Sequence, residues 1–246
     1  WNIYSYMVGE SFRSTLEKPN SFNTNVFKGL KVHSVDPSTK NGQSVKILMM
    51  GDSITHGNNG AQSSPVIQVH DLLSSRYNIT AAMVGSFNPY GQKCEGKGYQ
   101  SLGSFAGNNN YPHGREIAIN NCTTTAQFEN TFLFPATEDD KTNRPQYCFT
   151  NKPSYSDEPD GLSYQDATEE ERTNYHYFIF DFKRYLQMWG EDGSPEQLAA
   201  TPDIVTIALG TNDWLPSGII DLDKARAALG AIYTSIRRAS SDIKIV

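Results

Sequence analysis

Two short, continuous apolar runs constrain the fold of this 246-residue chain more than any other feature. One is KILMM at residues 46–50, and the other is PDIVTIAL at residues 202–209. Apolar runs of this length are typical of parallel strands that are buried on both faces of a sheet. The sequence therefore predicts an α/β fold, and more specifically a three-layer α/β/α sandwich around a parallel sheet.

Each run ends in a glycine that is followed by polar residues. GDSITHG occupies residues 51–57, and GTND occupies residues 210–213. Ligands of open α/β sheets bind beyond the carboxyl ends of the strands, so both motifs are expected at one functional edge. Gly51 is expected to supply a sharp exit turn, which places Ser53 as a nucleophile. A Gly-Asp-Ser triplet by itself is also typical of plain turns.

A glycine-rich segment lies between these two motifs in the chain. It reads CEGKGYQS over residues 94–101. Glycines let backbone N–H groups approach a ligand without an intervening side chain. The ordered set of three motifs is far more specific than any one of them.

The three motifs resemble those of the SGNH, or GDSL, hydrolases, a family of serine esterases and lipases. The resemblance covers roughly residues 45–246 and is dense only around the motifs. It implies a flavodoxin-like fold in which Ser53 attacks an ester carbonyl and forms an acyl-enzyme. It also implies an oxyanion hole formed by the backbone N–H groups of Ser53 and Gly98 and by the side-chain N–H of Asn212.

The second motif departs from the family pattern in its spacing. Relatives often have Glu-Gly, two further residues, and then Gly with an aromatic residue, whereas here only Lys97 separates Gly96 from Gly98. Gly98 is the preferred oxyanion donor because Tyr99 preserves the Gly-aromatic step. Gly96 and Gly85 remain alternatives, as does a turn glycine with no ligand.

The family's closing Asp-x-x-His motif, which carries the catalytic base, does not occur in this sequence. The histidines are His33, His56, His70, His113 and His176. His56 lies three residues after Ser53, and that short loop leaves its ring little freedom to turn onto the serine. A serine hydroxyl without a base is a poor nucleophile, so the base is expected elsewhere.

The end of the sequence suggests where the base lies. Residues 241–246 look like the start of another sheet strand, and a domain rarely ends inside such a run. We therefore expect residues 45–246 to be an incomplete hydrolase domain, completed beyond Val246 by a further segment or by another chain. Residues 1–44 read as an N-terminal extension packed on this domain.

Periodicity predicts several other elements. A helix is expected over residues 64–76 and a strand over residues 79–84. Thr168 and Glu171 resemble a capping box, which marks the start of a helix. Residues 221–240 predict an amphipathic helix with an apolar face of Leu222, Ala225, Leu229, Ile232 and Ile236. The aromatic residues that follow residue 176 are expected in the core: Phe178, Phe180, Phe182, Tyr185 and Trp189.

Residues 103–167 lack clear periodicity and read as a long insertion that begins beside the proposed oxyanion hole. We expect it to contribute substrate contacts, with Tyr111, His113 and Phe134 as candidates, although a solvated insertion fits equally well. Trp214 follows GTND and is either a substrate contact or a buried wedge. Asp52 and Asp213 are expected to organise their turns through hydrogen bonds.

Composition limits the partners. The formal net charge of −6 argues against a nucleic-acid partner. No apolar stretch approaches the roughly 20 residues that span a bilayer. The motifs imply neither a metal nor an organic cofactor.

Cysteines and sequons indicate the compartment. Cys94, Cys122 and Cys148 fall outside the expected sheet strands, where a disulfide can staple loops. Asn78 and Asn121 each begin a glycosylation sequon. Together these features favour a secreted glycoprotein with a disulfide, and the alternative is a cytosolic protein with reduced thiols.

The expected activity is ester hydrolysis. The second motif looks most like those of carbohydrate esterases, so the resemblance favours a carbohydrate O-acetylesterase or a related esterase or lipase, acting on a small-molecule or carbohydrate ester. The alternative is a secreted, non-catalytic glycoprotein that uses the fold for binding or assembly. The missing base supports that alternative.

Overall fold

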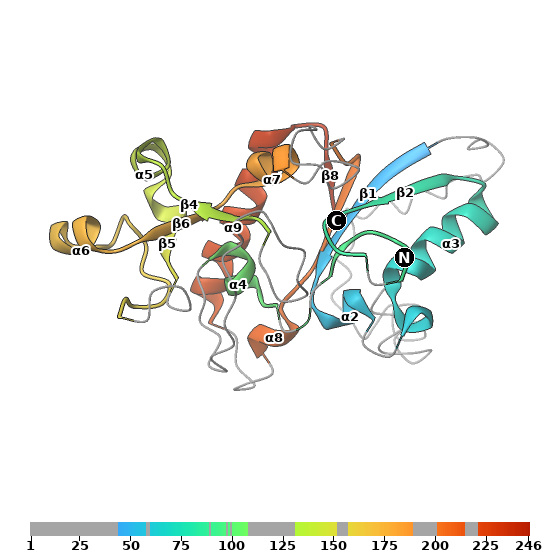
Figure 1. Cartoon of the computed structure of the whole chain (residues 1–246), viewed down its shortest axis with the longest axis horizontal. Coiled ribbons are helices and arrows are strands. Elements are labelled where there is room, and N and C mark those ends of the chain that lie inside the picture. Colours follow the sequence, from blue (N-terminus) through green and yellow to red (C-terminus); the bar gives the residue numbers. More distant parts are fainter. Residues whose placement is uncertain are drawn as a thin grey trace, which may run out of the picture. The chain divides into compact units, whose positions relative to one another are not determined.

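A computed structural model describes residues 44–57, 60–88, 90–96, 98, 100–107, 131–151, 157–188, 201–214 and 221–246. These residues form one parallel sheet and one small antiparallel sheet, with helices around them (Figure 1). The predicted N-terminal extension, apart from Ser44, lies outside the described residues. Tyr111, His113, Asn121 and Cys122 also lie outside them.

The parallel sheet has the strand order β2-β1-β7-β8, and β3 pairs with the carboxyl end of β1. Its strands are β1 (Ser44–Gly51), β2 (Thr80–Val84), β3 (Glu95–Gly96), β7 (Ile204–Ala208) and β8 (Lys244–Ile245). The strand pairs described in this sheet are parallel. The predicted α/β class and parallel sheet are therefore confirmed.

Helices connect and cover the strands. In chain order they are α2 (Ser53–His56), α3 (Pro65–Tyr77), α4 (Leu102–Ala106), α5 (Glu138–Asn143), α6 (Glu169–Asn174), α7 (Phe182–Met188), α8 (Thr211–Trp214) and α9 (Leu222–Ala239). Short 3-10 turns lie at Ala61–Ser63 and Pro145–Tyr147. The predicted capping box is present at the start of α6, where Thr168 and Glu171 bond reciprocally.

Strand β1 is buried on both faces because successive side chains of a strand point to opposite sides. Ile47 and Met49 belong to one apolar cluster, together with Val66 of α3. Leu48 and Met50 belong to a second cluster that includes residues of α4, α7 and α9. Figure 1 shows α3 on one side of β1 and α9 on the other.

The buried face of α9 differs from the predicted one. Leu222 and Leu229 are 63% and 45% exposed, although the pattern placed them on the apolar face. Ile232 and Ile236 of the predicted face are buried, together with Ala228 and Ala231. Leu229 instead lines a groove with Leu102, Ile207 and Ile245.

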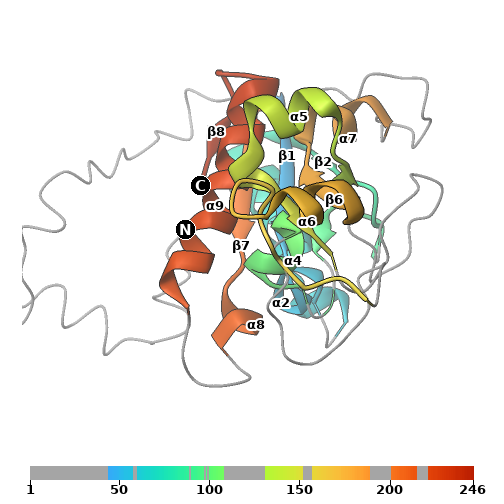
Figure 2. The same cartoon turned by 90° about the vertical axis from the view of Figure 1, so that its left-hand side faces the viewer.

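The antiparallel sheet has the order β4-β6-β5. Its strands are β4 (Leu133–Pro135), β5 (Cys148–Thr150) and β6 (Tyr177–Phe180). In Figure 2, where this sheet faces the viewer, it lies in front of α4 and β1. Two of its strands and α5 fall within residues 103–167, where the sequence shows no periodicity. Phe134 is buried in β4 at 6% exposure, so it is a core residue and not a substrate contact.

The aromatic core predicted after residue 176 is present. Phe178, Phe180, Phe182 and Tyr185 are each at most 3% exposed, and Trp189 lies outside the described residues. Phe132 packs its ring against Tyr185, with centroids 4.1 Å apart. These rings join the antiparallel sheet to α7.

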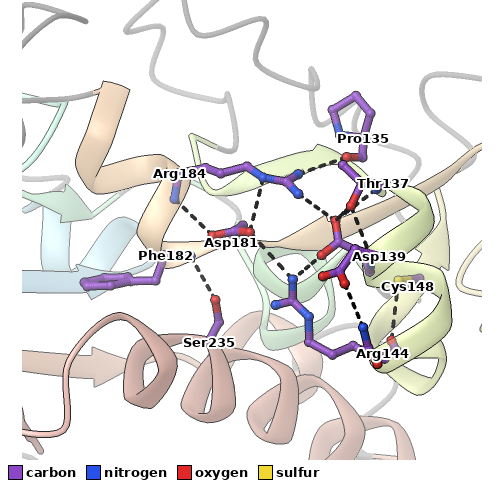
Figure 3. A network of polar contacts seen from close by, with 11 residues as sticks. Pro135, Thr137, Asp139, Arg144, Cys148, Asp181, Phe182, Arg184 and Ser235 are labelled. Carbon is purple, nitrogen blue, oxygen red and sulfur yellow. Dashed lines mark hydrogen bonds and ion pairs between the residues drawn. The ribbon is translucent and has the colours of Figure 1, made fainter.

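A buried ionic network joins α5 to the start of α7 (Figure 3). Asp140 is 1% exposed and accepts hydrogen bonds from Arg144 and, at 2.6 Å, from Arg184. Asp181 lies 3.3 Å from Nε of Arg184 and 3.9 Å from Arg144. Burial alone would raise the pKa of Asp140, but hydrogen bonds from Thr137 and Arg184 outweigh it and hold that pKa below its usual range.

Candidate active site

The three sequence motifs meet at the carboxyl edge of the parallel sheet. Gly51 at the end of β1 pairs with Ala208 of β7 on one side and with Gly96 of β3 on the other. The GDSITHG segment, the glycine-rich turn and GTND therefore leave the sheet from three adjacent strand ends. Figure 1 shows α2 and α8 at this same end of the sheet.

Gly51 is required because atoms of Thr55 and Ala208 lie close to it, and not for the predicted exit turn. A Cβ atom there would lie 2.0 Å from Oγ1 of Thr55 and 3.0 Å from the carbonyl oxygen of Ala208. The glycine of this motif with positive φ is Gly57, at 88°, which ends α2 in the left-handed conformation. The motif thus needs its first glycine for packing and its last for the turn.

Ser53 is the first residue of α2 and is half-buried. Asp52 precedes it as the N-cap, and its Oδ1 accepts the N–H of Ile54 at 2.8 Å. Burial raises the pKa of Asp52, although hydrogen bonds from Ile54 and Thr211 oppose the shift. Asp52 therefore organises the turn that carries the serine, as expected from the sequence.

The glycines of the second motif differ in their surroundings. A Cβ atom on Gly96 would lie 2.7 Å from the backbone nitrogen of His56, and one on Gly85 would lie 2.3 Å from the carbonyl oxygen of Cys94. Both glycines therefore have a packing role in the wall of the site. Gly98 is buried and lies in the turn that follows β3.

Asn212 ties the third motif to the second. It is 5% exposed, and its Nδ2 donates to the carbonyl oxygen of Gln100 at 2.8 Å. Asp213 accepts the N–H groups of Leu102 at 2.8 Å and of Gly103 at 3.4 Å, so it holds the first turn of α4 and not its own turn.

The described histidines have other partners than Ser53. His56 is 9% exposed and contacts the rings of Phe87 and Tyr90, with centroids at 5.0 and 5.8 Å. Burial lowers the pKa of His56 below its ordinary value. His70 bonds to the neighbouring Asp71 on the exposed side of α3.

His176 forms a pair that the sequence did not reveal. Its Nδ1 lies 2.6 Å from the buried carboxylate of Glu158, which also accepts the backbone N–H of His176. The two residues are 18 positions apart, so no local motif marks them. His176 directly precedes β6, and Figures 1 and 2 both show that end of β6 well apart from α2.

Glu95, in the strand that pairs with the end of β1, also has a role that no sequence motif predicts. It is 0% exposed, and its carboxylate accepts hydrogen bonds from three parts of the chain. Its position directly before Gly96 was visible in the sequence, but its partners were not.

The remaining predicted residues divide as follows. Asn78 is exposed and ends α3 in the left-handed conformation, with φ of 50°. Trp214 is the last residue of α8, and its side chain lies outside the described residues.

Cys94 and Cys148 are buried, and no disulfide joins the cysteines of the described ranges. Cys148 begins β5, contrary to its expected place outside the strands, and burial raises the pKa of its thiol to about 12.

Within the described ranges, no group of three or more metal-binding side chains gathers at one place. Of the helices that the structure describes, none combines the length and apolar character needed to cross a membrane. The comparisons with known proteins give no assignment, since no family model, curated protein or solved structure matches this chain.

Proposed function

We propose that this protein is a serine ester hydrolase of the SGNH type, with the three-layer, flavodoxin-like fold of that family. The observation that carries the proposal is the meeting of three polar motifs at adjacent strand ends, with Gly51 paired to both Gly96 and Ala208. A half-buried serine after one strand end and a buried amide after the neighbouring strand end suit acyl transfer.

In the proposed reaction, the Oγ of Ser53 attacks the ester carbonyl carbon while a histidine takes the hydroxyl proton. The negative charge on the carbonyl oxygen is met by the N–H groups of Ser53, Gly98 and Asn212. Each such donor typically contributes about 2.7–4 kcal/mol to the transition state. The alcohol leaves with the proton. Water then attacks the acyl-enzyme in the same way, and the Oγ of Ser53 leaves with a proton.

The proposal assigns the base to a histidine on a further segment or another chain. Support comes from the described histidines, since the ring of His56 contacts Phe87 and Tyr90, and His176 pairs with Glu158. The proposed substrate is an acylated carbohydrate, foremost an O-acetyl ester, with Trp214 and Tyr111 as contacts. The protein is proposed to be secreted and glycosylated at Asn78 and Asn121.

A second candidate function is binding without catalysis. It is favoured by the same observation about the histidines, because a serine without a base has no activating partner. In that case, the packing glycines and the hydrogen bond from Asn212 to Gln100 would only maintain the fold at this edge of the sheet.

Labelling with a fluorophosphonate distinguishes the two functions. An activated Ser53 forms a phosphorus–oxygen bond with loss of fluoride, so peptide mapping of the full-length protein is expected to place the adduct on Ser53. Ser63, an exposed serine that bonds to the carbonyl oxygen of Gly60, is the internal control and is expected to remain unlabelled. A folded, unlabelled protein would favour the binding function.

A further inference from the structure

The carboxylate of Glu95 is buried in the core beside the candidate site. Oε1 accepts the backbone N–H of Ser86 at 2.5 Å and the hydroxyl of Tyr185 at 2.7 Å. Oε2 accepts the hydroxyl of Thr131 at 3.0 Å. An ionised carboxylate is costly to bury unless hydrogen bonds replace its water, and here three donors do so.

The three donors come from separate parts of the fold. Ser86 follows β2, Thr131 precedes β4, and Tyr185 lies in α7. Burial raises the pKa of Tyr185 well above its usual value, and the charge of Glu95 adds to the shift, so the phenol stays protonated and donates. The carboxylate thus fixes β3 against three elements at once.

Strand β3, which carries Glu95, also borders the candidate site. Glu95 pairs with Met50, and Gly96 pairs with Gly51, two residues before Ser53. Gly96 also lies directly against the backbone of α2. Gly98, the proposed oxyanion donor, follows three residues after Glu95.

We propose that Glu95 is a positioning residue, whose carboxylate sets the placement of the Gly98 N–H relative to Ser53. This inference rests on the proposed function. Catalytic groups must be held to within about 0.5 Å, and a displacement of about 1 Å can cost on the order of 100-fold in rate. The three hydrogen bonds of Glu95 supply that restraint, whereas an apolar side chain at this position would only fill space.

Substitution by aspartate separates positioning from charge. Glu95→Asp keeps the carboxylate but shortens it by one methylene, so it cannot reach all three donors without pulling β3 inward. The expected result is a fall in kcat of roughly 10- to 100-fold with KM changed by less than about 3-fold. In Glu95→Gln, the amide oxygen can accept from Ser86 and Tyr185 while its N–H donates to Thr131, so this variant is expected to recover most of the lost kcat.

Glu158→Asp is the matched control, because it shortens another buried carboxylate that is hydrogen-bonded, to His176, away from α2. Its kcat is expected to equal that of the wild type. Tyr185→Phe removes one donor only and serves as the milder variant if Glu95→Asp unfolds, with a fall in kcat of roughly 3- to 10-fold. Thermal unfolding of every variant shows which of them are folded.

Hydrogen exchange gives a readout that does not depend on activity. Backbone amides of residues 96–98 and of α2 are expected to exchange faster in Glu95→Asp than in Glu95→Gln or in the wild type. Unchanged kcat and unchanged exchange in a folded Glu95→Asp protein would overturn the inference. Faster exchange in a protein whose wild type shows no Ser53-dependent hydrolysis would support the anchor and overturn the proposed function instead.

Discussion

Replacing Ser53 with alanine is expected to lower the kcat of the full-length protein for 4-nitrophenyl acetate by on the order of 10⁴-fold or more. The variant keeps the oxyanion donors but loses the atom that bonds to the acyl group. KM is expected to change little, because the hydroxyl contributes to the transition state more than to substrate binding. The measurement is steady-state hydrolysis, followed through release of 4-nitrophenolate.

The control for this prediction is Ser63→Ala. Ser63 is exposed and lies ten residues after Ser53, at the end of a 3-10 turn. Both variants remove one hydroxyl, but only Ser53 lies at the strand edge where the motifs meet. Equal hydrolysis by the two variants would show that Ser53 is not the nucleophile.

Replacing Asp140 with alanine is expected to lower the free energy of unfolding by about 3–5 kcal/mol. The carboxylate forms ion pairs with both Arg144 and Arg184, and Arg144 is itself 8% exposed. Without Asp140, both guanidinium groups lose a carboxylate partner, and Asp181 is left to pair with the two of them. Urea unfolding followed by circular dichroism measures the change.

The neighbouring Glu138 provides a control for Asp140. Its carboxylate pairs with Lys141 at 2.9 Å, but its side chain is 86% exposed. Solvent screens such a pair, so Glu138→Ala is expected to change the stability by no more than about 1 kcal/mol. Comparable losses in the two variants would contradict the structural role assigned to the buried network.

The depressed pKa of Asp140 also predicts a pH dependence. A carboxyl whose pKa is lower in the folded than in the unfolded protein stabilises the folded state at pH values above the unfolded pKa, which for an aspartate is ordinarily 3.8. This contribution is lost as the pH falls through the folded pKa. The stability of the wild type is therefore expected to fall below about pH 4, and Asp140→Asn is expected to lose less over that range.

Local patterns in the sequence predicted most elements of the parallel sheet, but not β3, which lies in the segment that reads as a glycine-rich turn. The apolar runs of β1 and β7 mark buried strands, and helical spacing marks α3 and α9, because these signals depend only on residues close in the chain. The buried face of α9 was predicted less well. Ile232 and Ile236 are buried as predicted, but Leu222 and Leu229 are exposed and Ala228 and Ala231 are buried, because the neighbouring elements that cover a helix face are not visible in its periodicity.

Long-range contacts could not be predicted in the same way. Glu95 bonds to residues 9, 36 and 90 positions away, so no window of the sequence contains its partners. Arg184 reaches Asp140 across 44 positions for the same reason. Strands β4 and β5 have three residues each, which is too short for alternation to show.

The most direct measurement of the central claim is the capture of the acyl-enzyme. The full-length protein is mixed with 4-nitrophenyl acetate, quenched with acid within the first turnover, and digested for mass spectrometry. The account predicts one acetyl group on the peptide that contains Ser53, formed in step with a burst of 4-nitrophenolate. An active protein whose acetyl group is absent from Ser53, or lies on another residue, would contradict it.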